Sequence, residues 1–188
     1  MGLGRGAVRD PRVVKTIVLL RGVNVGGHNK IAMADLKALL EDLGYADVRT
    51  VLQSGNAVVD AGKATPDAVA KQVEQAVHQH TGKTIRVLAR TAKELRQAID
   101  ANPLAAPTDP SRFLVTFLDK NSTGNPPDPK DHPGEQFAMV GRHVYQWLPN
   151  GFSGTKLTYA YWERALNVTA TARNWRTVTR LDELARPS

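Results

Sequence analysis

The sequence contains no cysteine, and this absence excludes several kinds of chemistry at once. Disulfides, thiolate nucleophiles and metal sites built on cysteine ligands all need a thiol, so none of them is available to this chain. A chain without cysteine also fits a reducing compartment. We therefore predict a cytoplasmic protein.

Long hydrophobic runs are missing as well. The most apolar stretch, residues 13–25, is interrupted by Lys15 and Arg21 and falls short of the roughly 20 apolar residues that a helix needs to span a bilayer. The stretch also lacks the long apolar core and small-residue cleavage site of a signal peptide. The sequence predicts no membrane segment and no membrane partner.

Metal-ligand spacing is absent among the five histidines. Only one pair, His78 and His80, lies as close as two positions in the sequence. On a helix, side chains two positions apart point in different directions, so this pair cannot bind one metal ion. We interpret all five as solvated surface side chains and predict no metal and no cofactor; they are His28, His78, His80, His132 and His143. No paired carboxylates or serine–base pair marks a catalytic centre, so catalytic residues and enzyme status stay open.

Charge is in surplus on the positive side, with 25 lysines and arginines against 18 acids and a net charge of +7. Basic surface attracts polyanions, so nucleic-acid binding is one hypothesis. The basic residues form no adjacent run, which favours an ordinary solvated surface. The strand-like stretches at 16–20 and 57–60 contain no aromatic residue, which argues against base stacking of the kind used by RNA-recognition domains.

The first half of the chain shows strand and helix patterns in the order βαββαβ. Residues 1–12 have no apolar period and predict a flexible N-terminal extension. A first lobe, residues 13–90, then follows from apolar periodicity and turn residues. Its predicted strands are 13–20, 48–53, 57–60 and 84–90, and its predicted helices are 33–43 and 65–81.

This element order is that of a ferredoxin-like fold, in which the strand order is 4-1-3-2 and both helices cover one face. In that arrangement the end of the first strand and the hairpin between the second and third strands lie at the same edge of the sheet. We therefore expect the loop 21–30 to neighbour Ser54, Gly55 and Asn56.

The second half, residues 91–188, predicts another α+β lobe. Thr91 and Glu94 form a capping box at the start of a helix, and residues 112–119, 136–140 and 143–148 read as strands. Helices are predicted over 155–166 and 172–185, and no internal repeat is evident. We expect a cleft between the two lobes to be the place for a ligand.

Four segments of the sequence resemble the signature segments of a family of uncharacterised bacterial proteins, domain of unknown function 1697 (DUF1697). These segments are residues 19–30, 53–56, 151–157 and 171–175, and together the resemblance runs from Val14 to Leu184. The resemblance implies two α+β lobes with a ferredoxin-like first part, and it implies no activity. Gly154 departs from the expected pattern, because a cation such as Arg is expected just before Lys156 and Leu157.

The polar residues of these segments are the candidate ligand-binding residues. Backbone amides near a glycine-rich turn can hold an anion, although the loop at 21–30 matches neither the Rossmann nor the P-loop fingerprint. Cations and aromatic rings in the later segments add a second wall to the candidate site. The set comprises Arg21, Asn24, Gly26, Gly27, Asn29, Lys30, Ser54, Gly55, Asn56, Lys156, Arg173, Asn174 and Trp175.

Each candidate also has a structural interpretation. The glycines turn the chain, Trp175 is a core residue at helical spacing, and Arg173, which we place in the first turn of the last helix, pairs with a carboxylate across the lobe interface. Three hypotheses therefore remain: a site for a small anionic ligand such as a nucleotide or phosphorylated metabolite, sequence-independent nucleic-acid binding, and a clamp between lobes with no ligand site. The oligomeric state is not indicated by the sequence.

Overall fold

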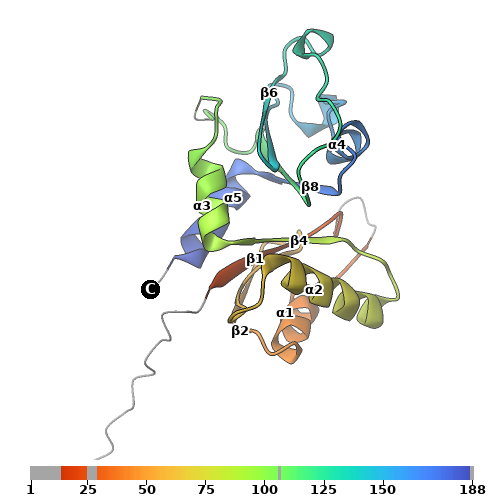
Figure 1. The fold of residues 1–188 in the computed structure, drawn as a ribbon, viewed down its shortest axis with the longest axis vertical. Helices are drawn as coiled ribbons and strands as arrows, with labels where there is room; N and C mark the ends of the chain where they lie inside the picture. Colours follow the sequence, from red (N-terminus) through yellow and green to blue (C-terminus); the bar gives the residue numbers. More distant parts are fainter. Residues whose placement is uncertain (1–13, 25–28, 106, 187–188) are drawn as a thin grey trace, which may run out of the picture.

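The structure is a computed structural model that describes residues 14–24, 29–105 and 107–186. The predicted extension, residues 1–12, lies outside the described residues, as do Gly26 and Gly27 of the candidate site. The described chain is a mixed α+β structure with two four-stranded sheets, one above the other in Figure 1.

The first sheet has the strand order β2-β3-β1-β4, and every neighbouring pair in it is antiparallel. Its strands are β1 (Lys15–Leu20), β2 (Ala46–Val51), β3 (Asn56–Asp60) and β4 (Val87–Thr91). Helices α1 (Met33–Asp42) and α2 (Pro66–Thr81) cover one face of this sheet. The elements agree in order with those expected for residues 13–90.

Helix α2 shows how the sequence sets these elements. The Thr65 hydroxyl caps the helix by accepting from the Ala68 N–H at 3.3 Å, and Pro66 occupies the first turn. Gly82 ends the helix in the left-handed conformation, at φ +69°. The buried face carries Val69, Val73 and Val77, which pack against the first sheet. These are the residues and the boundaries expected from the sequence.

The second sheet has the strand order β6-β7-β5-β8, again with antiparallel neighbours. Its strands are β5 (Phe113–Leu118), β6 (Gln136–Val140), β7 (His143–Trp147) and β8 (Ala170–Asn174). Helix α4 (Tyr159–Leu166) packs on its outer face, around the fully buried Trp162. Two short 3-10 segments, Pro129–Asp131 and Phe152–Gly154, lie in the connections.

Two helix predictions in this half are wrong at their starts. Residues before Tyr159 are not helical, because Thr158 is the N-cap of α4, so Lys156 lies in the connection. Ala172, Arg173 and Asn174 belong to β8, and helix α5 (Trp175–Ala185) begins after them. Pairing of β8 with β5 fixes this segment as a strand, and that partner lies more than fifty residues earlier in the chain.

The two halves share one arrangement, although the sequence shows no repeat. In each half the first strand pairs with the third strand on one side and with the fourth strand on the other. The fourth strand lies at an edge of the sheet and runs directly into a helix. Strand β4 leads into α3 (Ala92–Asp100) as β8 leads into α5, and the two helices lie side by side (Figure 1). The connection after β5 has no counterpart of α1 among the described residues.

A common apolar core joins the two sheets. The first sheet contributes Ile17 and Leu19 from the face opposite α1 and α2, and the second contributes Val115 and Phe117. Helices α3 and α5 close this core, with Leu95, Val178 and Leu181 fully buried. Because each such side chain contributes about 1.5–3 kcal/mol when buried, the contact is a principal part of the stability of both halves.

None of the described helices is long and apolar enough to cross a membrane.

Candidate functional site

The loop after β1 and the β2–β3 hairpin are neighbours, as the strand order predicts. The Leu20 N–H donates to the Gly55 carbonyl at 2.8 Å, and Asn24 Nδ2 donates to the Gln53 carbonyl at 2.5 Å. Gly55 has φ +69°, and a Cβ at this position would lie 2.3 Å from Cγ2 of Val23. Glycine is therefore required here both by the backbone conformation and by the close approach of the loop.

The asparagines of the candidate set hold this edge together. Asn24 donates to the Ile31 carbonyl at 2.9 Å and accepts from the Ile31 N–H at 3.1 Å. Asn29 Nδ2 donates to the Gly22 carbonyl at 3.4 Å. Asn56 is fully buried, and its Nδ2 donates to the Val51 carbonyl at 3.1 Å and to Ser54 Oγ at 2.9 Å. These amides fix the shape of the loop and of the hairpin.

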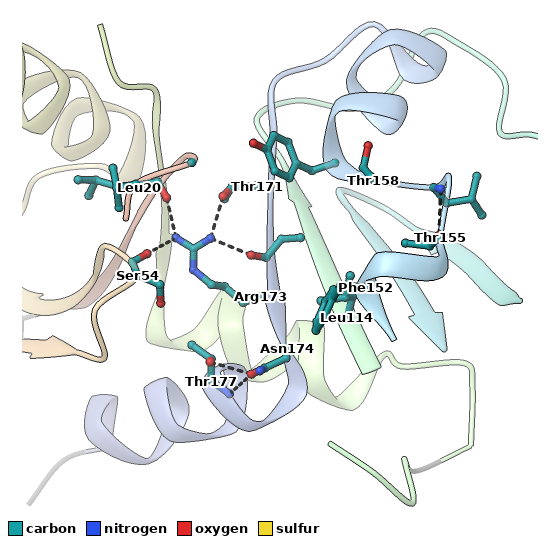
Figure 2. A pocket seen from close by; sticks show the side chains of 15 residues that line it. Leu20, Ser54, Leu114, Phe152, Thr155, Thr158, Thr171, Arg173, Asn174 and Thr177 are labelled. Atoms are coloured by element: carbon teal, nitrogen blue, oxygen red, sulfur yellow. Dashed lines mark hydrogen bonds between the residues drawn. The ribbon is translucent and has the colours of Figure 1, made fainter. Parts of the chain in front are cut away.

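Arg173 reaches from β8 of the second sheet into this edge of the first. Its Nη2 donates to the carbonyls of Leu20 at 2.7 Å and Ser54 at 3.3 Å (Figure 2). Its Nε donates to Asn56 Oδ1. Its Nη1 donates to Thr171 Oγ1 and to the Ala172 carbonyl, each at 2.8 Å. Arg173 therefore joins the two sheets from a strand position; the expected position in the first turn of a helix is wrong.

The charge of Arg173 has no carboxylate to balance it among these partners. Arg173 is 7% exposed, and all five acceptors named above are neutral oxygens. Burial lowers the pKa of Arg173 to about 10, so the guanidinium remains charged at neutral pH. A buried cation held only by neutral acceptors attracts negative charge into any space beside it.

Arg21 makes the second bridge between the halves. Its Nε and Nη2 donate to the two carboxylate oxygens of Glu163 on α4, at 2.8 and 2.7 Å, and its guanidinium lies 5.0 Å from the ring centre of Tyr159. The hydrogen bond to Glu163 raises the pKa of Arg21. This bidentate pair neutralises Arg21 and ties the end of β1 to the second sheet's helix.

A cavity of about 440 Å³ lies between these bridges. Leu20, Val23 and Ser54 line it from the first half, and β5, β8 and the starts of α4 and α5 line it from the second. Within the described lining, Arg173 is the one charged side chain. Its volume falls within the roughly 300–1,000 Å³ of small-molecule sites.

Three polar side chains of the lining accept hydrogen bonds from the protein. Ser54 Oγ accepts from Asn56, Thr171 Oγ1 from Arg173, and Asn174 Oδ1 from Thr177. The remaining protons, on the two hydroxyls and on Asn174 Nδ2, have no acceptor within hydrogen-bond distance among the described residues. A lining of this kind suits a ligand that offers oxygen acceptors.

The described candidate residues divide into four groups. Ser54, Arg173 and Asn174 line the cavity, while Arg21, Asn24, Asn29, Gly55 and Asn56 build the edge behind it. Lys30 and Lys156 are exposed and do not line the cavity. Trp175 packs edge-to-face on Phe113, with ring centres 5.2 Å apart, which agrees with its interpretation as a core residue.

Sequence reasoning missed Thr171, Thr177, Tyr159 and Phe152 among the lining residues, and it missed Glu163 as the partner of Arg21. One signal was available. Thr171 and Arg173 alternate, so they share a face once residues 170–174 are assigned to a strand. The residues of α4 and the preceding loop gave no such signal, because tertiary packing alone brings them to the first sheet.

A second arginine, Arg90, makes the equivalent contact from the first half to the second. Arg90 and Arg173 each lie one residue before the helix N-cap that ends their edge strand, which is Thr91 or Asn174. Arg90 Nη2 donates to the carbonyl of Leu118, the last residue of β5, at 2.5 Å, as Arg173 Nη2 donates to Leu20, the last residue of β1. We call these contacts the Arg90 junction and the Arg173 junction.

His143 shows that one histidine prediction is wrong. It pairs with Phe117 at the start of β7, the position that Asn56 takes in β3, and its Nε2 is buried. Neither this nitrogen nor Arg90 Nε has a hydrogen-bond partner among the described residues, whereas Asn56 and Arg173 Nε bond to each other. Burial, followed by the charges of Arg90 and Arg142, lowers the pKa of His143 to about 4.

Comparison with known proteins places these features in a wider group. A family model described as "Protein of unknown function (DUF1697)" matches residues 13–145, more than half of the chain. The structure is similar to that of a conserved bacterial protein, SP0830 from Streptococcus pneumoniae, with a TM-score of 0.66 and 18% identity over 93% of this chain and 99% of that chain. At this identity the likeness speaks for the fold alone. No curated protein matched the sequence.

Proposed function

Since the chain belongs to the DUF1697 family, whose function is unknown, we propose from the geometry that it binds a small anionic ligand in the cavity between the two sheets. The observation that carries this proposal is the buried charge of Arg173, which lines the cavity and meets only neutral acceptors there. The donors of Ser54, Thr171 and Asn174 beside it suit the oxygens of an anion.

The Arg90 junction supports this proposal by contrast. Burial, followed by the charge of Arg142, lowers the pKa of Arg90 to about 10, and three acids act in the opposite direction and favour its charged form: Glu94, Asp67 and Asp119. Glu94 lies three residues after the N-cap of α3, Asp67 two residues after the N-cap of α2, and Asp119 one residue after the end of β5. The residues at the equivalent positions of α5, α4 and β1 are Thr177, Ala160 and Arg21. No acid stands at any of the three positions, so a bound anion would supply the charge that the protein supplies to Arg90.

The two other hypotheses have less support. Several surface arginines pair with carboxylates, among them Arg49, Arg86 and Arg96, so part of the positive charge is neutralised within the protein and is less available to nucleic acid. A clamp without a ligand site agrees with the bonds of Arg21 and Arg173, but it gives no role to a cavity lined by donors.

We also propose that residues 13–90 form a ferredoxin-like lobe and residues 91–188 a second lobe. The element order and the strand order β2-β3-β1-β4 support the first assignment, and the repeated strand order supports the second. The proposed ligand would then sit where the lobes meet, which is a common place for small-molecule sites.

A thermal-shift screen of nucleotides, phosphorylated metabolites and carboxylates tests the proposal on the parent protein and on Thr177→Glu. A ligand at 100 times its Kd stabilises by about 2.7 kcal/mol, which for a chain of this size corresponds to roughly 5–10 °C. Thr177→Glu places a carboxylate in the cavity at the position of Glu94 in the other half, so we expect the stabilisation to disappear.

Thr177→Gln is the matched control, because it adds the same bulk without the charge and should retain more of the stabilisation than Thr177→Glu. A screen in which no anion stabilises the parent would contradict the proposal. Equal stabilisation of the parent and of Thr177→Glu would show that the anion binds elsewhere.

A further inference from the structure

The charges around the cavity limit how much negative charge it can accept. Arg173 is the one charged side chain of the described lining, and Arg21 is already neutralised by Glu163. Lys30 and Lys156, the other candidate cations, lie outside the lining. A di- or triphosphate would bring several charges into a space with one cation, and an unpaired charge in such surroundings is costly.

The hydrogen bonds that Arg173 already makes also limit how it can bind a ligand. Its Nε, Nη1 and Nη2 all donate to protein acceptors, so no nitrogen is left for a two-pronged bond to a phosphate. The guanidinium acts on a ligand through its electrostatic field, while the hydroxyls and the Asn174 amide donate the hydrogen bonds. A single carboxylate group matches one unit of charge and a few donors.

Apolar side chains make up a large part of the remaining lining. Leu114 and Leu157 are buried residues of the lining, and the nearby Phe152 of the 3-10 segment also lines the cavity (Figure 2). Phe152 is 51% exposed. A hydrocarbon or aromatic group that covers Phe152 would remove its ring from water, at a gain proportional to the apolar area buried.

From these three observations we propose that the ligand is an amphipathic monoanion, an aromatic or aliphatic carboxylate. Its carboxylate lies among Ser54, Thr171 and Asn174 in the field of Arg173, and its apolar body lies against Leu114 and Phe152. This inference rests on the proposed function and narrows the class of ligand.

Calorimetric titration with defined probes tests the class. We expect phenylpropanoate and octanoate to bind, phenylpropanamide to bind at least ten times more weakly because it lacks the charge, and inorganic phosphate and ATP not to bind. Phe152→Ala should weaken phenylpropanoate binding about 5- to 20-fold. Met139→Ala removes a comparably exposed apolar side chain outside the cavity lining, and it should leave the affinity unchanged.

The outcomes separate this inference from the function on which it rests. If ATP or another phosphate binds, loses its binding in Thr177→Glu, and the carboxylates do not bind, the cavity is an anion site and the proposed class is wrong. If no anion binds, both proposals fail. Carboxylate binding that Phe152→Ala and Thr177→Glu leave unchanged would place the ligand elsewhere and would overturn both.

Discussion

Arg173 and Arg90 occupy the same position in their strands, and each donates to the last carbonyl of the first strand of the other half, at 2.7 and 2.5 Å. Their surroundings differ. The hairpin opposite Arg90 turns through Gly141 and Arg142, and Arg142 donates to Glu94 at 3.0 Å, whereas the hairpin opposite Arg173 is longer and carries no charge in residues 52–55. The same kind of contact thus has acids and Arg142 beside it at the Arg90 junction, where Arg90 lines a cavity of about 250 Å³, and it borders the larger cavity of about 440 Å³, without acids in its described lining, at the Arg173 junction.

The largest expected difference between the junctions is in stability. Arg173→Ala leaves five acceptors without their donor, and we expect a loss of about 3–5 kcal/mol in the free energy of unfolding. Arg90→Ala strands two carbonyls, those of Ala89 and Leu118, so about 2–3 kcal/mol is expected. Urea unfolding without ligand measures both.

Arg180→Ala is the control for these variants, because Arg180 is exposed and pairs with Glu183 within one helix; a change of at most about 0.5 kcal/mol is expected. Unchanged stability in Arg173→Ala would remove its role as a bridge between sheets. A larger loss in Arg90→Ala would reverse the proposed order of the two junctions.

The hairpins offer a second test of the comparison. A Cβ on Gly55 would lie 2.3 Å from Val23 Cγ2 and 2.8 Å from Leu20 Cβ, whereas a Cβ on Gly141 would meet nothing within 4 Å, although both glycines have positive φ. Gly55→Ala should therefore cost about 2–4 kcal/mol from clash and strain together. Gly141→Ala should cost about 1 kcal/mol from strain alone, and thermal unfolding of the two variants would show whether the difference exists.

A third test of the comparison is a pH dependence at the Arg90 junction. The pKa of His143 is about 4 in the folded protein and about 6.5 in an unfolded chain, so the unfolded state takes up a proton first as the pH falls. Stability is therefore complete well above pH 6.5 and decreases down to pH 4, by about 3 kcal/mol in total. The groups acting on His143 are Arg90, Arg142 and Glu94.

His143→Asn recreates at this junction the residue that stands at the Arg173 junction, where Asn56 accepts from Arg173 Nε. The variant should be less sensitive to pH between 6.5 and 4 than the parent, as measured by urea unfolding at a series of pH values. Carboxylates that titrate near pH 4 contribute equally to both proteins and cancel in the difference. Parallel pH profiles for the two proteins would rule out this role for His143.

Local signals were sufficient for the first half of the fold. The cap at Thr65, the capping box at Thr91 and the apolar spacing of α2 act within a few residues, so the sequence displays them directly. Strand β8 could not be predicted in this way. Its residues, Ala170–Asn174, have no alternation of large apolar side chains, and they form a strand because β5 offers them a free edge.

The candidate site was likewise predictable only where strand order or a recognisable segment placed its residues. The approach of the loop to Gly55 followed from strand order, and Arg173 lay in a recognisable segment. Glu163, Tyr159 and Phe152 come from α4 and the connection before it, whose place beside the first sheet depends on the packing of the whole chain. His143 is half-buried, with its Nε2 buried, for the same reason: its neighbour Arg90 belongs to the other sheet.

The shared core has a consequence for synthesis of the chain on the ribosome. The first sheet is complete once β4 has emerged, and α3 and β5 then follow, but the covering of the face that bears Ile17 and Leu19 is completed only by Val178 and Leu181 of α5. At a synthesis rate of about 5–20 residues per second, the chain between β4 and α5 takes roughly 5–20 s to make. Throughout that interval the nascent protein carries an apolar surface that its own translated residues cannot yet cover completely.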